Sequence, residues 1–271
     1  MHRASGSMLE SIDTGIPLRL DAMLSLQATL TDLSRRSDLR AAAQFPLLDL
    51  AAIVAYMLII LSLPGLFRPR KIQQGWPGWR MLIRDISLSA VALEVGSLLS
   101  ALLAAYLFQR QWLRADLAKP SAASLLIQAS GTITLYDLYL FGVHRLLHLG
   151  PLFTYLHSVH HRSTAPTPVT AFAIHPIEAV INFVFLPAFM VLTPVNFYAV
   201  MAAGLYFQVA AIVLHSGHEV FPRWWRRSAL GYLFPTVRFH DFHHSQGAGN
   251  YGIITTIWDR LFGTTVPIAW R

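Results

Sequence analysis

The chain contains no cysteine and few charged residues. Among its 271 residues there is no Cys, and only 13% are Asp, Glu, Lys or Arg. The lack of cysteine excludes disulfides, iron–sulfur clusters, thiolate-bound haem and cysteine-type zinc sites. In soluble domains the charged fraction is about 25%. The low value here indicates that lipid rather than water surrounds much of the chain.

Acidic residues are scarcer than basic ones. The chain has 14 Asp and Glu against 21 Lys and Arg, a net charge of +7, and 54% of its residues are hydrophobic. This excess of positive charge is typical of the cytoplasmic loops of membrane proteins and of surfaces that face anionic headgroups. No basic run is interleaved with aromatic residues outside the apolar segments, so nucleic acid is not an expected partner.

Long apolar runs fill much of the chain beyond residue 45. They cover residues 50–67, 86–108, 122–143 and 177–214, and the last is interrupted near Pro187 and Pro194. Because a membrane-spanning helix needs about 20 residues, the last run is expected to hold about two helices, arranged as a hairpin. We therefore predict an all-α integral membrane protein with about four transmembrane helices. Its domain would cover residues 45–271, after an amphipathic or flexible lead-in over residues 1–44.

Histidine is abundant and strongly clustered. The chain has 12 histidines, and all except His2 lie between residues 144 and 244. Three short motifs, HRLLH, HSVHH and HDFHH, hold eight of them: His144, His148, His157, His160, His161, His240, His243 and His244. The remaining three are His175 in AIHPIE, and His215 and His218 in LHSGHE.

The spacing within the three motifs is helical. Residues at i, i+3 and i+4 share one face of a helix, so each motif can present two or three imidazoles to one point. The first motif begins where an apolar run ends, which places the motifs just outside the bilayer. Neutral imidazole suits zinc, copper, nickel and iron. Eight clustered ligands exceed the needs of one tetrahedral ion, and the count therefore predicts two metal ions.

Two simpler metal sites fit the motifs poorly. A soluble zinc protease uses HExxH, in which the glutamate is the general base, and HRLLH has no acidic residue at that position. A b-type haem needs only two histidines and would leave the other motifs without a role.

The three motifs resemble those of the fatty acid hydroxylase and sterol desaturase superfamily of membrane di-iron enzymes. DLYLFGVHRLLH and FHDFHHSQGAGNYGIITTIWDRLFGT are also similar to it, and the resemblance covers about residues 85–267. The segment HSGHEVFP resembles the C-4 methylsterol oxidase branch, with His218 where that branch tends to have tyrosine. AIHPIE matches a His-Pro-x-Glu element of the superfamily.

The resemblance implies a transmembrane helical base under a cytosolic, histidine-rich helical cap that binds two iron ions. The implied ligands are the eight motif histidines and His215. It leaves His175 and His218 as either ligands or hydrogen-bond donors to ligands. Asp137 is one helical face from His144, and we expect it either to orient that imidazole, as a catalytic residue, or to make a polar contact between helices.

The implied activity is O2-dependent hydroxylation or desaturation of a lipid or sterol. No flavin or dinucleotide fingerprint and no ferredoxin cysteine occurs in the sequence. We therefore expect a separate electron donor, a reductase with a ferredoxin or a cytochrome. A membrane zinc-dependent hydrolase and a histidine-rich metal transporter remain as alternatives.

The distribution of positive charge predicts an orientation. Residues 67–85, 144–176 and 215–271 would share one side of the membrane, and they carry most of the arginines outside the N-terminal segment. The positive-inside rule then places the histidine cap in the cytoplasm.

Overall fold

The computed structural model of the chain describes residues 54, 70–73 and 75–268. The expected lead-in 1–44, and the expected span 50–67 apart from Val54, lie outside the described residues. The long helices are α5 (Trp79–Gln109), α6 (Ala122–Leu147), α9 (Pro176–Leu192) and α10 (Phe197–Leu214). Each coincides with an apolar run, so the described part is mainly helical, as predicted.

Shorter elements connect and extend the long helices. They are β1 (Ala115–Asp116), α7 (Gly150–Leu152), the π-helix η2 (Phe153–His157), α8 (Ser158–His161), the 3-10 helix η3 (Pro168–Phe172), β2 (Val195–Asn196), the 3-10 helix η4 (Trp225–Arg227), α11 (Ala229–Leu233), α12 (Val237–Gln246) and α13 (Ile257–Leu261). The strands β1 and β2 pair in parallel, Ala115 with Val195 and Asp116 with Asn196. This pairing joins the loop before α6 to the turn between α9 and α10.

The break between α9 and α10 lies at residues 193–196. Pro194 causes it, because the residue before a proline is pushed out of the helical region, and Thr193 is extended at φ −132° and ψ 125°. Asn196 then starts α10 by accepting a hydrogen bond from the backbone N–H of Tyr198. The expectation of a second break near Pro187 was wrong, since α9 continues through that residue.

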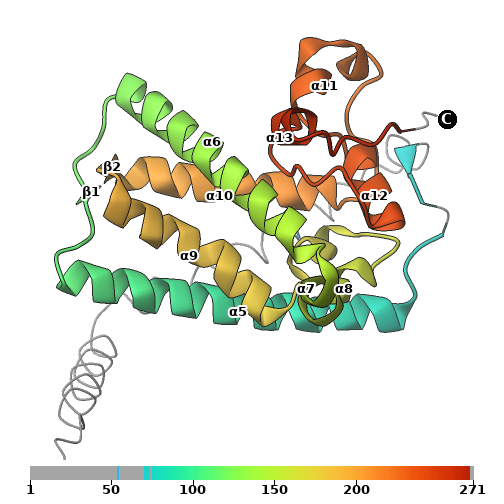
Figure 1. Cartoon of the computed structure of the whole chain (residues 1–271), viewed down its shortest axis with the longest axis horizontal. Coiled ribbons are helices and arrows are strands. Elements are labelled where there is room, and N and C mark those ends of the chain that lie inside the picture. Colours follow the sequence, from blue (N-terminus) through green and yellow to red (C-terminus); the bar gives the residue numbers. More distant parts are fainter. Residues whose placement is uncertain (1–53, 55–69, 74, 269–271) are drawn as a thin grey trace, which may run out of the picture. The chain divides into compact units, whose positions relative to one another are not determined.

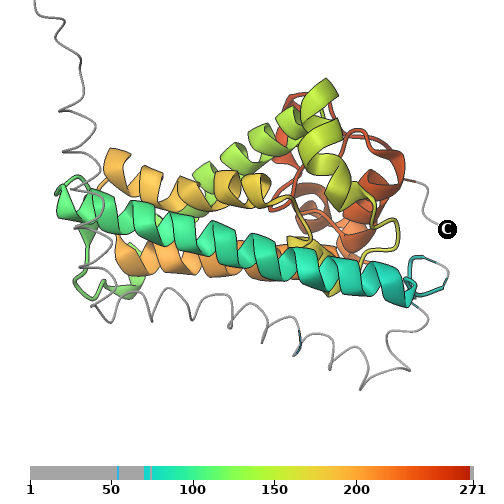
Figure 2. The same cartoon turned by 90° about the horizontal axis from the view of Figure 1, so that it is seen from below.

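The long helices pack together, and the short helices α7, α8, α11, α12 and α13 gather where α6 and α10 end, beside the first turns of α5 (Figures 1 and 2). Helix α5 packs along α9, and α6 packs against α10. Gly96 allows the close approach of α5 to α9, because a Cβ there would lie 2.7 Å from the ring of Phe183. Residues 148–172 and 215–264, which include these short helices, are called the cap below.

Two of the described helices, α5 and α10, are long and apolar enough to cross a membrane, and α9 is an apolar helix of 17 residues. Large apolar side chains on the long helices face outward: Ile127 is 72% exposed and Leu205 62% exposed. Such outward apolar surfaces suit helices in contact with lipid. The interior between the helices is also apolar, with Leu93, Tyr136 and Phe207 in one buried cluster.

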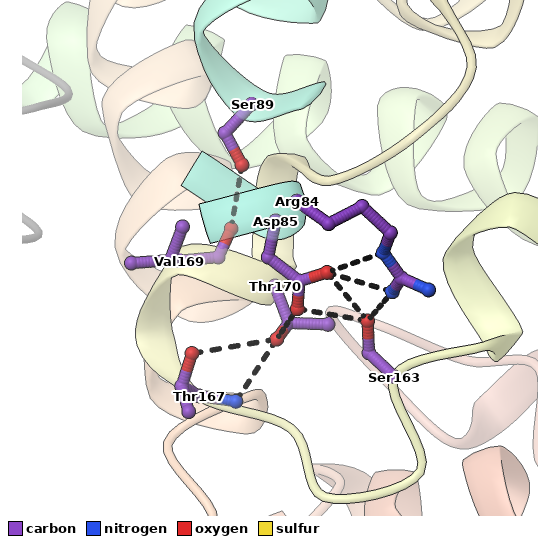
Figure 3. Close-up of polar contacts among 7 residues, drawn as sticks. All are labelled: Arg84, Asp85, Ser89, Ser163, Thr167, Val169 and Thr170. Carbon is purple, nitrogen blue, oxygen red and sulfur yellow. Dashed lines mark hydrogen bonds and ion pairs between the residues drawn. The ribbon is translucent and has the colours of Figure 1, made fainter. Parts of the chain in front are cut away.

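A buried carboxylate joins α5 to the loop after HSVHH (Figure 3). Asp85, which is 2% exposed, accepts hydrogen bonds from Ser163 Oγ at 2.8 Å and Thr170 Oγ1 at 3.0 Å. It also forms an ion pair with Arg84 at 2.7 Å. The backbone N–H of Ser163 donates to the carbonyl of His160. A buried charge is stable only when it is paired and hydrogen-bonded, so this network fixes the loop that follows His160.

We expect Asp85→Asn to lower the stability of the fold by about 2 kcal/mol, the usual effect of losing hydrogen bonds to a charged group. The amide would place N–H donors against the hydroxyl donors of Ser163 and Thr170. A matched control is Ser89→Ala, which removes one hydrogen bond from the same helix to the carbonyl of Val169 at 2.8 Å and should cost about 1 kcal/mol. Thermal unfolding in detergent measures both, and a smaller effect for Asp85→Asn than for Ser89→Ala would contradict the role given to the network.

Candidate metal centre

Nine of the eleven clustered histidines converge in two groups. The first group is His144, His148, His157, His161 and His243, and the second is His160, His215, His240 and His244. Within each group, one ring nitrogen from every member lies within 4.8 Å of the others. The two groups are adjacent, since the rings of His161 and His244 stack with centroids 4.9 Å apart. The structure thus offers sites for two ions side by side.

The division between the groups follows the helical spacing. His157 and His161, four residues apart, belong to the first group, whereas His160 belongs to the second. In α12, His240 and His244, which are also four residues apart, belong to the second group. His243, which lies between them in the sequence, belongs to the first group. The expectation that each motif converges on one point was therefore wrong for two motifs. Each i, i+4 pair serves one group, and the remaining histidine serves the other.

Many nitrogens of these residues are buried without a partner. Among the described residues no hydrogen bond reaches Nε2 of His148, His157, His161, His243 and His244, or Nδ1 of His160, His240 and His244. A buried polar atom without a partner costs about 1–3 kcal/mol. Bound metal ions would satisfy one such nitrogen on each of these residues, so the residues present fit a pair of metal ions.

Backbone carbonyls orient three of the imidazoles. Nδ1 of His144 lies 2.8 Å from the carbonyl oxygen of Tyr251, and Nδ1 of His243 lies 2.7 Å from that of Gly249. Nδ1 of His215 lies 2.7 Å from the carbonyl oxygen of Ala211. An imidazole that donates from Nδ1 keeps the lone pair of Nε2 free for a metal. These contacts therefore select the tautomer that a metal site requires.

His157 has a carboxylate as its partner instead. Its Nδ1 lies 3.0 Å from Oε1 and 3.1 Å from Oε2 of Glu178, and both side chains are buried. Carboxylate partners fix the ring of a metal-binding histidine and increase its basicity. The sequence analysis did not name Glu178 as a functional residue, although a signal for it was present. Glu178 is the acid of AIHPIE and begins an apolar run, where an acid requires a partner.

The histidines of the cap are neutral. Burial lowers the pKa of His148 and His157 to about 3 and that of His161 to about 2. Burial, and then the neighbouring His215, holds the pKa of His160 well below its usual range. Only neutral imidazole coordinates a metal, so the cap holds its histidines in the form that binds.

Asp137 does not orient His144, whose Nδ1 contacts the carbonyl of Tyr251. The carboxylate of Asp137 accepts hydrogen bonds from Thr255 Oγ1 at 2.6 Å and Trp258 Nε1 at 2.8 Å, and from the backbone N–H groups of residues 254 and 255. It joins α6 to the C-terminal segment that follows HDFHH. Because that segment supplies the carbonyl of Tyr251, Asp137 acts on the centre by positioning the segment.

His175 and His218 lie in neither group, although the sequence placed them among the candidate ligands. His175 precedes α9, and its Nδ1 accepts a hydrogen bond from the backbone N–H of Ile177 at 3.2 Å, as a helix cap does. His218 is buried beside Trp76, with its Nδ1 2.8 Å from the carbonyl oxygen of Ser216. Each imidazole thus contacts a backbone group two residues away in the sequence.

A cavity of about 50 Å³ lies against the two groups. Five histidines border it, together with Glu178: His144, His157, His160, His215 and His240. Its other walls are mainly apolar, with Leu140 from α6, Phe183 from α9 and Phe207 from α10. An apolar cavity that ends at a set of metal-binding nitrogens can place a C–H bond beside a metal.

Fold and centre together define a class: a helical protein in which two groups of buried histidines, fit for a pair of metal ions, close one end of an apolar helix bundle. The family model of the fatty acid hydroxylases matches residues 130–264. That segment is about half of the chain and contains all nine converging histidines. The chain belongs to the fatty acid hydroxylase family.

Several relatives of the chain act on sterols according to their names. It is 35% identical over 143 residues to methylsterol monooxygenase 1 of Danio rerio, a match that covers 52% of this chain and 47% of that protein. It is 32% identical over 153 residues to a putative methylsterol monooxygenase of Dictyostelium discoideum, covering 54% of each. Identity to a Delta(7)-sterol 5(6)-desaturase of Gibberella zeae is 29%, over 47% of this chain and 38% of that protein.

The chain spans about half the length of the curated relatives it matches. The matches support the superfamily and the branch of the methylsterol oxidases that the sequence predicted. No solved structure matches the chain significantly.

Proposed function

We propose that this chain is a membrane di-iron oxygenase that hydroxylates or desaturates C–H bonds of a lipid or sterol, using O2 and external electrons. The observation that carries the proposal is the apolar cavity, which ends at two groups of buried histidines. The names of the relatives, monooxygenase and desaturase, support the same chemistry. The outward apolar surfaces of α5, α6 and α10 support insertion into a membrane.

Two iron ions, when bound by the two groups, supply activation of dioxygen and removal of hydrogen from an unactivated carbon. The residues of the protein orient the imidazoles and enclose the cavity. The carbonyls of Tyr251 and Gly249 and the carboxylate of Glu178 hold three imidazoles in the ligating tautomer. Leu140 and Phe207 help exclude water from the cavity, which protects reactive species from side reactions. Insertion of oxygen gives an alcohol, and removal of a second hydrogen gives an alkene.

We propose that the electrons for this reaction come from a separate donor, a reductase with a ferredoxin or a cytochrome. We propose that the cap faces the cytoplasm, where reduced carriers are available. The arginines of residues 144–176 and 215–271 support this orientation through the positive-inside rule.

The two alternative functions lack a comparable observation. A zinc hydrolase needs a free general base at the metal. The carboxylate of Glu178 contacts His157, and that of Asp241 accepts two hydrogen bonds from Gln73 Nε2 at 2.8 and 3.0 Å. A metal transporter needs ligands along its membrane path, whereas these nine histidines gather at one end of the helices.

The metal content tests the proposal. We expect about two iron ions per chain in protein purified without oxygen, because the five and four imidazoles of the two groups each suffice for one ion. Elemental analysis gives the count, and oxygen uptake with reduced donor and lipid gives the chemistry. A single tightly bound zinc ion and no oxygen uptake would instead establish the hydrolase.

A further inference from the structure

Asp259, in α13, is a buried carboxylate that lies outside the two histidine groups. Its side chain is 0% exposed. Oδ1 accepts hydrogen bonds from the backbone N–H of Tyr251 at 2.9 Å and from Thr264 Oγ1 at 2.6 Å, and Oδ2 accepts from the backbone N–H of Gly252 at 2.7 Å. The ionised form of aspartate only accepts hydrogen bonds. It therefore suits a position at which all three partners donate.

One of these contacts leads through a single peptide group to a histidine of the first group. The N–H of Gly252 and the carbonyl of Tyr251 belong to the same planar peptide. The N–H donates to Asp259, and the carbonyl oxygen lies 2.8 Å from His144 Nδ1. Because a carbonyl only accepts, Nδ1 carries the proton and Nε2 is left free for an ion. The carboxylate, the peptide and the imidazole thus form a continuous chain of hydrogen bonds.

The comparable contact of His243 lacks a carboxylate. Its Nδ1 lies 2.7 Å from the carbonyl oxygen of Gly249. The N–H of that peptide, which belongs to Asn250, donates at 2.9 Å to the neutral backbone carbonyl of Thr264. The third carbonyl that orients an imidazole lies within α10. Of the three peptides, that of His144 is the one whose N–H meets a charged acceptor, and such hydrogen bonds are about twice as strong as neutral ones.

The charge of Asp259 is balanced by hydrogen bonds and not by a cation, since none of the ion pairs in the described part of the chain includes it. Successive hydrogen bonds in a protein interior polarise one another, so the carboxylate makes the carbonyl of Tyr251 a stronger acceptor. A stronger acceptor at Nδ1 increases the basicity of the imidazole as a metal ligand. A metal ion bound by His144 would in turn supply the positive charge that a buried carboxylate requires.

We propose that Asp259 is a positioning residue that strengthens metal binding by the first group, acting through the Tyr251 peptide and His144. Together with Glu178, which contacts His157 directly, it gives the first group two carboxylates. In the described residues no carboxylate hydrogen-bonds to a histidine of the second group, so the two ions would be inequivalent. This inference rests on the metal centre of the proposed function but not on its oxygen chemistry.

Zinc binding to the detergent-solubilised full chain, measured by competition with a chelator, tests the inference without turnover. The affinity of the first group is the one that His243→Ala weakens. We expect Asp259→Asn to lower it by about tenfold, the lower end of the effect of removing a partner of a metal ligand. In a His144→Ala background, which leaves four imidazoles in the group, the same substitution should have no further effect, because the imidazole through which it acts is gone.

The matched control is Thr264→Val, which removes a hydrogen bond to Oδ1 of the same carboxylate but leaves both backbone N–H groups bound to it. We expect unchanged zinc affinity. A merely structural role of Asp259 would weaken zinc binding equally in the wild-type and the His144→Ala backgrounds. That result would overturn the inference, and so would an unchanged affinity in Asp259→Asn.

If Asp259→Asn does not fold, wild-type protein still provides a test. In zinc-loaded protein with isotope-labelled histidine, the Nδ1 proton of His144 should resonate further downfield than that of His243, because a stronger hydrogen bond deshields its proton. The loss of one signal in His144→Ala and of the other in His243→Ala assigns them. A proton of His144 level with that of His243, or upfield of it, would overturn the inference.

Oxygen uptake by iron-loaded wild-type protein with reduced donor and lipid is measured in parallel. The absence of uptake, with the expected zinc affinities, would contradict the oxygenase function and support the role of Asp259. Uptake together with an equal effect of Asp259→Asn in both backgrounds would contradict only the role of Asp259.

Discussion

Alanine at His243 or at His160 is expected to abolish lipid oxidation, with a loss greater than about a hundredfold, because even the partners of metal ligands contribute ten- to hundredfold. The two residues represent the two groups. His243→Ala should weaken the ion of the first group, and His160→Ala that of the second. In each case the iron content should fall from about two ions per chain towards one. The variants should still insert into membranes, because the apolar helices drive insertion.

The control for these variants is His175→Asn. It removes an imidazole that the sequence placed among the candidate ligands, but asparagine is itself a favourable helix cap and should preserve the start of α9. We expect full iron content and unchanged oxidation. If His175→Asn lost as much iron as His243→Ala, the assignment of histidines to the two groups would be wrong. Unchanged oxidation in both alanine variants would refute the metal assignment itself.

The sequence predicted much of the described fold, because apolar runs and caps are local signals. The run at residues 122–143 begins at the first residue of α6, and Ser121 caps that helix by accepting from Ser124 N–H. The break before α10 follows from Pro194. Pro187 does not break α9, because an apolar helix tolerates a proline when another group satisfies the carbonyl that it leaves free. Ser100 Oγ does so here by donating to the carbonyl of Phe183.

The sequence identified which histidines form the candidate centre, but not how they divide into two groups. Helical spacing places His157, His160 and His161 on one face, but it cannot show that His160 turns to a different group. That division depends on where α12 and the end of α10 approach, which is a property of the tertiary fold. A π-helix over Phe153–His157 ends at the first of these histidines. It changes the angle between residues along the helix, and such insertions occur frequently at functional sites.

The contacts that hold the imidazoles were the hardest part to predict. The carbonyl of Tyr251 reaches His144 across 107 residues, and no side-chain pattern signals a backbone acceptor. Gly249 offers a weak hint, since it adopts φ +71° and a Cβ there would lie 2.4 Å from Val266 Cγ2. Only the folded C-terminal segment, anchored on Asp137, brings these carbonyls to the histidines.

The second prediction with a large expected effect concerns membrane topology. A cysteine on one side of a membrane is labelled almost completely by an impermeant reagent on that side and hardly at all by the same reagent on the other side. The structure brings residues of the segments 144–176 and 215–271 into common histidine groups, so both segments must lie on one side of a membrane. Ser163 is fully buried and would be a poor labelling site, whereas the neighbouring Thr164 is exposed, as is Ser245 in α12. Ala118 is exposed beside β1, at the other end of the long helices.

Because the native chain has no cysteine, each of Thr164→Cys, Ser245→Cys and Ala118→Cys would carry a single thiol. We expect an impermeant maleimide to label the first two from the cytoplasmic side and the third from the opposite side. The physical reason is the positive-inside rule, applied to the arginines that flank the histidine groups. If Thr164→Cys and Ser245→Cys were both labelled from the non-cytoplasmic side, the proposed orientation would be wrong, but the metal site would remain possible. Labelling of these two variants from different sides would separate the histidines that the centre requires, and the metal site could not exist in the membrane.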